Sequence, residues 1–263
     1  MRGPPLLMGL TDKVVVVTGA ASGIGKAVAR RAVAEGVLAL VLTDRDAAGC
    51  ARLAAELEGA TEIVCVAADL ADHAAPARIA LAAKSRFGRI DALVNAAGLT
   101  TRGSLTNATP EIWDEVFSVN ARAAFFLMQA VAADFLARRA AGSIVNILSM
   151  NALCGIPELA VYAGSKAALA TLTRNAAHAH MADRIRVNGI NLGWVATEGE
   201  ERMQAQTLGR GAGWLAEASA RQPLGRLVTA DEAARLVVFL LGDASTPMSG
   251  AVIDLEQKVA GAI

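Results

Sequence analysis

Short apolar runs alternate along the chain with longer, alanine-rich segments of helical periodicity. The apolar runs predict seven strands, near residues 14–18, 37–43, 62–68, 91–97, 143–149, 185–191 and 250–255. The segments between them predict helices near residues 23–35, 46–58, 72–86, 110–138, 160–182 and 230–241. Strands that are apolar along their whole length are typical of a parallel sheet covered by helices on both faces. The pattern therefore predicts a doubly wound α/β fold around a mostly parallel, seven-stranded sheet.

The chain shows no internal repeat and no break in composition, so we expect one domain over residues 13–263, preceded by a tail of residues 1–12. One segment departs from the alternation, because residues 193–226 are polar and contain six glycines. A long excursion in a compact domain is usually functional or disordered. We therefore predict a substrate lid at about residues 194–226.

The charge balance and hydropathy narrow the function classes. Lys plus Arg and Asp plus Glu number 25 each, and no long run of like charge occurs, so we expect no nucleic-acid partner. The mean hydropathy of +0.41 raises the question of a membrane span. The most apolar stretch, residues 123–137, is too short for one and contains Gln129 and Asp134. We interpret it as a buried amphipathic helix and expect no membrane association.

The N-terminal residues lack an apolar core long enough for a secretory signal. The three cysteines, Cys50, Cys65 and Cys154, have no metal-ligand spacing. His178 and His180 stand two positions apart in a predicted helix and so face different sides. These observations predict a cytoplasmic protein with no metal site.

The only tyrosine, Tyr162, precedes Lys166 by four positions in a predicted helix. Side chains at i and i+4 share one helix face, about 6 Å apart along the axis. A phenol beside an ammonium group can act as an acid or a base. A lone tyrosine is more often a half-buried packing residue. The pair alone leaves both interpretations open.

The first predicted strand runs directly into TGAASGIG, with glycines at positions 19, 23 and 25. Such glycines let the backbone turn tightly and approach a pyrophosphate at the positive N-terminus of the following helix, although an ordinary glycine-rich turn is the alternative. Asp44 ends the second predicted strand, 25 positions after Gly19. A carboxylate there can accept hydrogen bonds from ribose hydroxyls. Taken alone, such an aspartate is more often an N-cap or a solvated turn residue.

Together these features resemble the short-chain dehydrogenases/reductases, over residues 13–255. The family's motifs appear in order as Thr18-Gly-x-x-x-Gly-Ile-Gly25, Asp69-Leu70, Asn95-Ala-Ala-Gly98, Asn120, Ser149, Tyr162-x-x-x-Lys166 and Leu192-Gly193…Thr197. Each motif is weak by itself, but their joint register makes coincidence implausible. The resemblance implies a Rossmann-like fold and a nicotinamide-dependent oxidoreductase.

The resemblance also implies roles for four catalytic residues. Tyr162 is implied to be the general acid/base, with a pKa lowered by Lys166 and by the nicotinamide charge. Lys166 is also implied to bind the nicotinamide ribose. Ser149 is implied to hydrogen-bond the substrate oxygen. Asn120 is implied to hold a water molecule that relays protons to Lys166.

The remaining implied contacts concern the cofactor and the substrate. Those to the cofactor come from the glycine loop, from the ends of the second to fourth strands and from the segment after the sixth: Gly19, Ser22, Gly23, Ile24, Gly25, Asp44, Arg45, Asp69, Leu70, Asn95, Ala96, Gly98, Val195 and Thr197. Asn151 and Trp194 are expected to contact substrate together with Ser149 and Tyr162. The chain departs from the family pattern at Ala96, where Asn is common, and at Leu192, where Pro is common.

We predict hydride transfer between NAD(H) and a secondary alcohol or ketone. Asp44 should repel the 2′-phosphate of NADP, whereas Arg45 can pair with it, so NADP is expected to be the poorer cofactor. The charged lid favours a small polyhydroxylated substrate such as a sugar or polyol. Two alternatives are an NADPH-dependent ketoacyl or xenobiotic ketone reductase and a catalytically silent, cofactor-sensing regulator. By resemblance, the helices near 110–138 and 160–182 form a dimer interface, and we expect a homotetramer.

Overall fold

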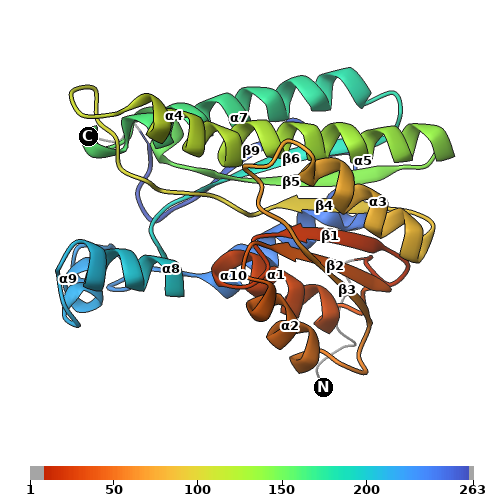
Figure 1. Cartoon of the computed structure of the whole chain (residues 1–263), viewed down its shortest axis with the longest axis horizontal. Helices are drawn as coiled ribbons and strands as arrows, with labels where there is room; N and C mark the ends of the chain where they lie inside the picture. The colour runs from red at the N-terminus through yellow and green to blue at the C-terminus, as the bar shows by residue number, and fades with distance from the viewer. Residues whose placement is uncertain (1–8, 261–263) are drawn as a thin grey trace.

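The computed structural model describes residues 9–260 and contains a seven-stranded sheet in the order β3-β2-β1-β4-β5-β6-β9 (Figure 1). Every neighbouring pair in this sheet is parallel, which sharpens the prediction of a mostly parallel sheet. The strands are β1 (Val14–Thr18), β2 (Ala39–Asp44), β3 (Glu62–Ala67), β4 (Ala92–Asn95), β5 (Gly142–Ser149), β6 (Ile185–Leu192) and β9 (Val252–Leu255). The predicted doubly wound α/β fold is confirmed.

Helices cover both faces of the sheet because successive side chains of a strand point to opposite sides. Val15 and Val17 of β1 belong to the core beneath α1 (Gly23–Ala34), α2 (Ala47–Glu56) and α10 (Ala230–Leu241). Val16 belongs to the core beneath α3 (Ala75–Phe87), α5 (Ala124–Arg138) and α7 (Ala160–His180). Two apolar layers therefore enclose a sheet with no solvated face at its centre.

Leu10 is fully buried in the first of these cores. Packing therefore begins before residue 13, where we expected the domain to start. Most of the predicted tail, residues 1–8, lies outside the described part of the chain.

The helix predicted over residues 110–138 has three parts. Between α4 (Pro110–Phe117) and α5 lies a π-helical stretch, η1 (Ser118–Ala123). The whole segment is long and apolar enough to cross a membrane, but 56% of its most apolar window is buried within the protein. Since Leu127, Val131 and Phe135 lie fully inside the second core, this composition is that of a core helix.

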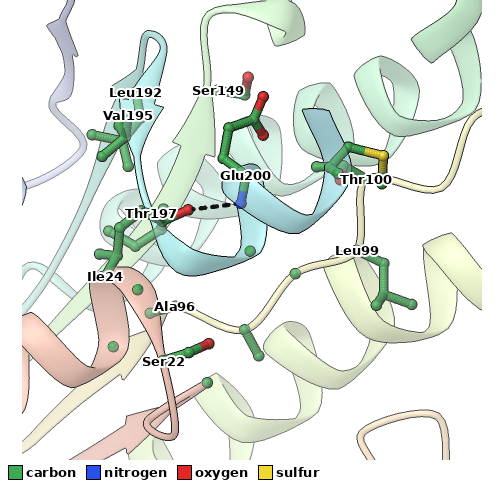
Figure 2. A pocket seen from close by; sticks show the side chains of 18 of the residues that line it. Ser22, Ile24, Ala96, Leu99, Thr100, Ser149, Leu192, Val195, Thr197 and Glu200 are labelled. Atoms are coloured by element: carbon green, nitrogen blue, oxygen red, sulfur yellow. Dashed lines mark hydrogen bonds between the residues drawn. The ribbon is translucent and has the colours of Figure 1, made fainter. Parts of the chain in front are cut away.

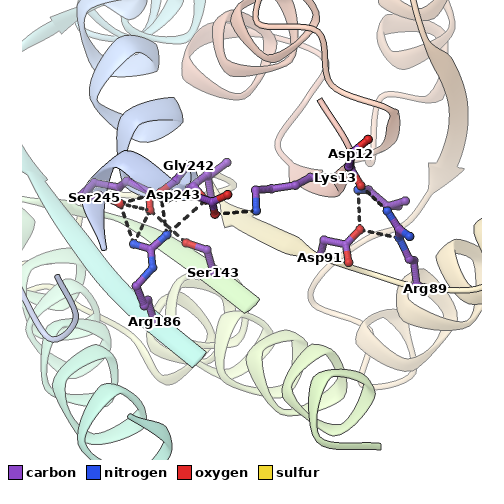
Figure 3. A network of polar contacts seen from close by, with 12 residues as sticks. Asp12, Lys13, Arg89, Asp91, Ser143, Arg186, Gly242, Asp243 and Ser245 are labelled. Carbon is purple, nitrogen blue, oxygen red and sulfur yellow. Dashed lines mark hydrogen bonds and ion pairs between the residues drawn. The ribbon is translucent and has the colours of Figure 1, made fainter. Parts of the chain in front are cut away.

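A polar network joins the amino-terminal ends of the strands (Figure 3). Arg186, near the start of β6, donates to the carbonyl oxygens of Leu240 and Gly242 at the C-terminus of α10, each at 2.9 Å. A cation is favourable there because the helix dipole is negative at that end. Lys13, just before β1, pairs with Asp243 at 2.9 Å. This end of the sheet is thus closed by structural contacts, which leaves the carboxyl ends of the strands for a site.

The segment predicted as a lid, residues 194–226, folds apart from the sheet. It contains β7 (Val195–Ala196), α8 (Glu198–Glu201), the π-helical η3 (Arg202–Thr207) and α9 (Trp214–Ala220), and β7 pairs with β8 (Val228–Thr229). Figure 1 shows α8 and α9 to one side of the sheet. A small core of its own contains Trp214, Ala218 and Leu227, with Trp194 packed against it. We call residues 194–226 the lid segment below.

Candidate active site

A cleft of about 1120 Å³ opens at the carboxyl ends of the strands. The order of the sheet reverses between β1 and β4, which is where ligands bind in open α/β sheets. Most of the residues predicted from sequence line this cleft: Gly19, Ser22, Gly23, Ile24, Gly25, Asp44, Arg45, Asp69, Leu70, Ala96, Gly98, Ser149, Asn151, Tyr162, Lys166, Trp194, Val195 and Thr197. Asn95 and Asn120 are not among the lining residues.

The glycine loop between β1 and α1 needs its glycines for two separate reasons. Gly19 and Gly23 have φ values of 67° and 53°, in the left-handed region that favours glycine. A Cβ on Gly25 would lie 2.3 Å from the carbonyl oxygen of Gly19. The helix can therefore start directly against the strand, with its N-terminal N–H groups turned toward the cleft.

The Asp44 carboxylate is held in place by backbone donors. Its Oδ2 accepts a hydrogen bond from the N–H of Ala21 in the glycine loop at 3.1 Å, and its Oδ1 accepts one from the N–H of Asp46 at 3.0 Å. Arg45 is exposed, and Arg52 also lines the cleft. A fixed anion and two arginines thus line the same part of the cleft, and Arg52 also pairs with Asp46 at 3.5 Å.

The loop after β3 contains Asp69 and Leu70, the two residues expected near the adenine of the cofactor. Leu70 is buried at the wall of the cleft, and Asp69 accepts a hydrogen bond from the N–H of Ala71 at 2.8 Å. This bond fixes the turn after the strand and uses one carboxylate oxygen of Asp69. Both residues lie where the sequence placed them.

The N-terminus of α1 already holds an anion, the carboxylate of Glu198 from the lid segment. Glu198 accepts a hydrogen bond from the N–H of Gly23 at 3.0 Å and pairs with the ammonium group of Lys26 at 2.9 Å. The Lys26 hydrogen bond lowers the pKa of Glu198 to about 2. The carboxylate oxygens stand in for phosphate oxygens, so the donors of this loop fit the diphosphate of a nicotinamide cofactor.

Ser149, Tyr162 and Asn151 form one polar group at the carboxyl end of β5. Ser149 ends β5, and Tyr162 lies in the first turn of α7. The Ser149 side chain acts on the Tyr162 phenol and lowers its pKa, so the two groups face the same part of the cleft. The Ser149 hydroxyl also accepts from the backbone N–H of Asn151 at 3.2 Å and from its side-chain amide at 3.4 Å. The serine and the phenol can therefore act on one substrate oxygen.

Lys166 lies one turn further along α7 and is almost fully buried. Its ammonium group donates to the carbonyl oxygen of Ile147 at 2.8 Å and lies 5.9 Å from the centre of the Tyr162 ring. Burial lowers the pKa of Lys166 to about 8. The i, i+4 pair of the sequence is thus a true neighbour pair inside the cleft.

The pKa of Tyr162 differs from the expectation for the complete site. Burial raises the pKa of the phenol above its ordinary value, while the hydrogen bond with Ser149 acts in the opposite direction. The negative charge of Glu200 also raises this pKa. In the chain by itself, desolvation therefore outweighs any lowering by Lys166. The lowering expected from the family resemblance is not found in the chain by itself.

Asn120 and Asn95 lie behind the cleft and support it. Asn120, in η1, bonds both the N–H and the carbonyl oxygen of Leu99, at 2.8 and 2.9 Å, and donates to the Ser165 hydroxyl at 3.0 Å. Asn95 is buried and donates to Asn146 at 2.9 Å, so its side chain does not form the expected floor of the cleft. The alternation of β4 explains this correction, because consecutive strand residues face opposite ways.

Three residues that sequence reasoning did not assign complete the site. The Thr18 hydroxyl accepts from the N–H groups of Ala96 and Ala97, both at 3.0 Å, and so fixes the loop after β4. Glu198 and Glu200 enter from the lid segment. Thr18 stood in the glycine motif and was available as a signal. The two glutamates were visible only as lid charges, because their reach into the cleft depends on how the lid segment folds.

Figure 2 shows the lid side of the cleft. Thr197 packs against the glycine loop, since a Cβ on Gly23 would lie 3.4 Å from its side chain. Its hydroxyl caps α8 by accepting from the N–H of Glu200 at 3.2 Å. Trp194 donates from its indole nitrogen to Glu200 at 2.7 Å. Thr197 therefore joins the glycine loop to the lid segment, whereas the Trp194 side chain bonds within the lid segment and Val195 pairs with Val228.

Comparison with known proteins agrees with this geometry. A family model described as "Enoyl-(Acyl carrier protein) reductase" matches residues 19–257. A Rhizobium meliloti (strain 1021) protein named "Probable galactose dehydrogenase" is 34% identical over 258 residues, covering 95% of this chain and 96% of that protein. Galactitol 2-dehydrogenase of Agrobacterium fabrum is 34% identical over 237 residues, covering 89% and 91%.

The structure of L-sorbose reductase from Gluconobacter frateurii, complexed with NADPH and L-sorbose, superposes with a TM-score of 0.91 at 27% identity. It covers 98% of this chain and 100% of that one. The similarity thus extends through the sheet and the lid segment to nearly the whole molecule. The chain belongs to the short-chain dehydrogenase/reductase family and is an oxidoreductase that uses a nicotinamide cofactor and acts on CH–OH groups.

Proposed function

We propose that this protein interconverts a secondary hydroxyl group and a ketone on a sugar or polyol, with NAD as the preferred cofactor and Tyr162 as the general acid/base. The observation that carries the proposal is that Ser149, Tyr162 and Lys166 line one cleft, with the Lys166 ammonium group 5.9 Å from the Tyr162 ring, together with a fixed Asp44. Ser149 and Tyr162 supply proton transfer, and Asp44 supplies cofactor choice.

A nicotinamide cofactor held by the glycine loop and Asp44 would supply the acceptor for the hydride that leaves the carbinol carbon during oxidation. Tyr162 takes the hydroxyl proton of the same carbon, and Ser149 donates a hydrogen bond to the oxygen as it becomes a carbonyl. In reduction the phenol returns its proton to that oxygen. Burial raises the pKa of the phenol in the chain alone. A positive charge bound nearby would favour the phenolate and so lower this pKa.

Lys166 and Asn120 support this proton transfer. The Lys166 ammonium can donate to a ribose hydroxyl in addition to the Ile147 carbonyl oxygen, because it carries three N–H donors. Asn120 is proposed to hold the relay water expected from the family resemblance. Its side-chain contacts to Leu99 and Ser165 support a second role in fixing the loop that contains Gly98.

The NAD preference rests on Asp44. Both carboxylate oxygens accept backbone hydrogen bonds, so the charge cannot move away from an incoming 2′-phosphate. Arg45 is exposed, and its attraction for a phosphate is screened by solvent. An NADPH-dependent reductase is the second candidate, because Arg45 and Arg52 flank the site and L-sorbose reductase was solved with NADPH.

The sugar or polyol assignment is supported by the names of the similar proteins, which include galactose, galactitol and L-sorbose enzymes. The cleft agrees with it in its polar groups, since Ser149, Asn151, Trp194 and Glu200 all line it. We propose that the lid segment closes over such a substrate, with Asn151 and Trp194 in contact with it.

A substrate panel tests the proposal. Simple alcohols, polyols and sugars are assayed with NAD and NADP by nicotinamide absorbance, in both directions. We expect turnover of polyols or sugars with NAD above all. Turnover only of acyl ketones with NADPH would support the second candidate, and tight cofactor binding with no turnover of any compound would support a regulator.

We also propose a cytoplasmic homotetramer. The free thiols of Cys50 and Cys65 suit a reducing compartment. Trp113, Phe125 and Phe126 on α4 and α5 are partly exposed and offer an apolar face for a second copy. Light scattering at micromolar concentration should give a tetrameric mass, and a monomeric mass would contradict the proposal.

A further inference from the structure

The backbone of α8 directs the side chain of Glu200 into the cleft. Thr197 caps this helix, and its hydroxyl accepts from the N–H of Glu200 at 3.2 Å. Figure 2 shows the Glu200 side chain extending toward Ser149. The next residue, Glu201, has its carboxylate elsewhere, on the indole nitrogen of Trp214 at 2.6 Å. Of the two neighbouring glutamates, only Glu200 lines the cleft.

The Glu200 carboxylate is anchored at one oxygen. Its Oε1 accepts from the indole nitrogen of Trp194 at 2.7 Å and from the amide of the buried Gln204 at 2.6 Å. No donor among residues 9–260 bonds the other oxygen, Oε2. Two donors therefore fix the group, and one oxygen is left with its full capacity to accept hydrogen bonds.

The charge of Glu200 acts on the reacting end of the site. It raises the pKa of the Tyr162 phenol, which lines the same cleft as Ser149 and Glu200. The carboxylate thus lies within electrostatic range of the oxygen that exchanges its proton. This charge opposes phenolate formation, so Glu200 does not assist proton transfer. The Glu200 carboxylate can instead accept a hydrogen bond from a substrate hydroxyl, because it lines the same cleft as Ser149 and Tyr162.

We propose that Glu200 is a substrate-binding residue that accepts a hydrogen bond from a hydroxyl on a carbon next to the reacting carbon. The inference rests on the proposed function and narrows it. The preferred substrates are then neutral vicinal diols and α-hydroxy ketones within sugars and polyols. Compounds that carry a carboxylate at that position are disfavoured by repulsion from Glu200.

The test compares Glu200→Gln with the wild type on two substrates. One is the best polyol of the panel, and the other is its deoxy analogue without the adjacent hydroxyl. The glutamine keeps a carbonyl oxygen that accepts from Trp194, so the lid contact survives. Compared at the pH where oxidation is at its maximum for each enzyme, we expect kcat/KM for the polyol to fall by about tenfold or more, as for loss of a hydrogen bond to a charged group, and kcat/KM for the deoxy analogue to change little.

A second readout separates binding from a loss of structure. Glu200→Gln removes a charge that raises the pKa of Tyr162, so the pH at which alcohol oxidation reaches half its maximum should move downward for both substrates. Glu201→Gln is the matched control, because Glu201 is also an α8 residue that bonds a tryptophan, Trp214, but does not line the cleft. It should leave both the substrate ratio and the pH profile unchanged.

The outcomes distinguish this inference from the proposed function. If the wild type uses polyols and Glu200→Gln lowers kcat/KM equally for both substrates, or for neither, Glu200 does not bind the adjacent hydroxyl. If the wild type neither turns over nor binds any polyol, the sugar or polyol assignment fails and this inference fails with it. A selective loss on the polyol together with the downward pH shift supports the inference.

Discussion

The nucleotide loop around β1, α1 and Asp44 and the lid segment are held by different kinds of interaction. The nucleotide loop is held mainly by its backbone, through left-handed glycines and through N–H groups that bond the Asp44 carboxylate. The lid segment is held by side-chain carboxylates, since Glu198 bonds Lys26, Glu200 bonds Trp194 and Glu201 bonds Trp214. Only Val195–Ala196 of the lid segment enters a strand pairing.

The difference separates two tasks within one cleft. Backbone donors fixed by a parallel sheet bind the common part of a cofactor, whose shape is the same for every substrate. Side-chain pairs in a loop can be exchanged without disturbing the sheet, and they decide what reaches Ser149 and Tyr162. We therefore expect changes on the sheet side to alter chemistry and cofactor choice, and changes on the lid side to alter access and substrate choice.

The largest effect is expected at Tyr162, on the sheet side. Tyr162→Phe removes the phenolic hydroxyl that exchanges the proton but keeps the ring, so the rate of the chemical step should fall by ~10²–10⁴-fold. Cofactor affinity, measured by fluorescence titration, should change little. A variant that retained more than about a tenth of the wild-type rate in a chemistry-limited assay would assign the acid/base role to another group.

Lys166, on the sheet side, is proposed to serve catalysis, but its buried charge destabilises the folded protein. Its pKa lies near 8 because the ammonium group is buried, so keeping it charged at pH 7 costs the folded state about 3 kcal/mol. Lys166→Met should weaken turnover and cofactor binding, yet raise the free energy of unfolding in urea at pH 7 by about 1–3 kcal/mol after loss of the Ile147 hydrogen bond.

The pH dependence of that gain has a definite sign. Below pH about 8 both the folded and the unfolded wild type hold the Lys166 proton, and the cost is fully present. Between about 8 and 10.5 the folded form loses the proton first, so wild-type stability rises and the advantage of Lys166→Met shrinks. Lys84→Met, at a half-exposed lysine, is the control and should change stability by less than about 0.5 kcal/mol. A destabilised Lys166→Met would contradict this account.

Cofactor choice should respond to Asp44 by a smaller factor. We expect the wild type to prefer NAD over NADP in kcat/KM by about tenfold or more, roughly 1.4 kcal/mol. Asp44→Ala should narrow or reverse the ratio, because the repulsion of the 2′-phosphate is then removed and Arg45 can pair with it. Asp72→Ala removes a carboxylate outside the cleft and should leave the ratio as it is. An unchanged ratio in Asp44→Ala would show that Asp44 does not select the cofactor.

The smallest effect is expected where the two regions meet, at Glu198. Its carboxylate occupies the donors of Gly23 and Lys26, so a diphosphate must displace it. Glu198→Gln should therefore raise the affinity for ADP several-fold in calorimetry, on the order of 1 kcal/mol, and leave the affinity for adenosine unchanged. Because the pKa of Glu198 is about 2, the effect should persist throughout the neutral pH range.

Glu56→Gln serves as the control for this prediction, since Glu56 also pairs with a cation of α1, Arg30, but lies outside the cleft. It should leave ADP binding unaltered. Equal ADP affinity in Glu198→Gln and the wild type would mean that the two regions are not in competition for these donors.

The same contrast explains what could be predicted from the sequence. The sheet, its helices and residues such as Gly19, Asp44 and Tyr162 follow from periodicity and short motifs, because a strand end or an i, i+4 pair fixes their positions locally. The side-chain direction of Asn95 and the π-helical turn at Asn120 depend on packing between elements, which no local pattern expresses. The roles of Glu198 and Glu200 depend on contacts across 175 and 6 positions of the chain, respectively, within a segment of weak periodicity.

Isotope transfer gives the most direct test of the central claim, that the cleft passes a hydride from a secondary carbinol carbon to the cofactor while Tyr162 takes the proton. The best polyol of the panel is deuterated at the reacting carbon and oxidised with NAD in ordinary water, and the NADH formed is analysed by mass spectrometry. The account predicts that the deuterium is transferred to the NADH. NADH that forms without deuterium, or a label that is released to the solvent, would contradict it.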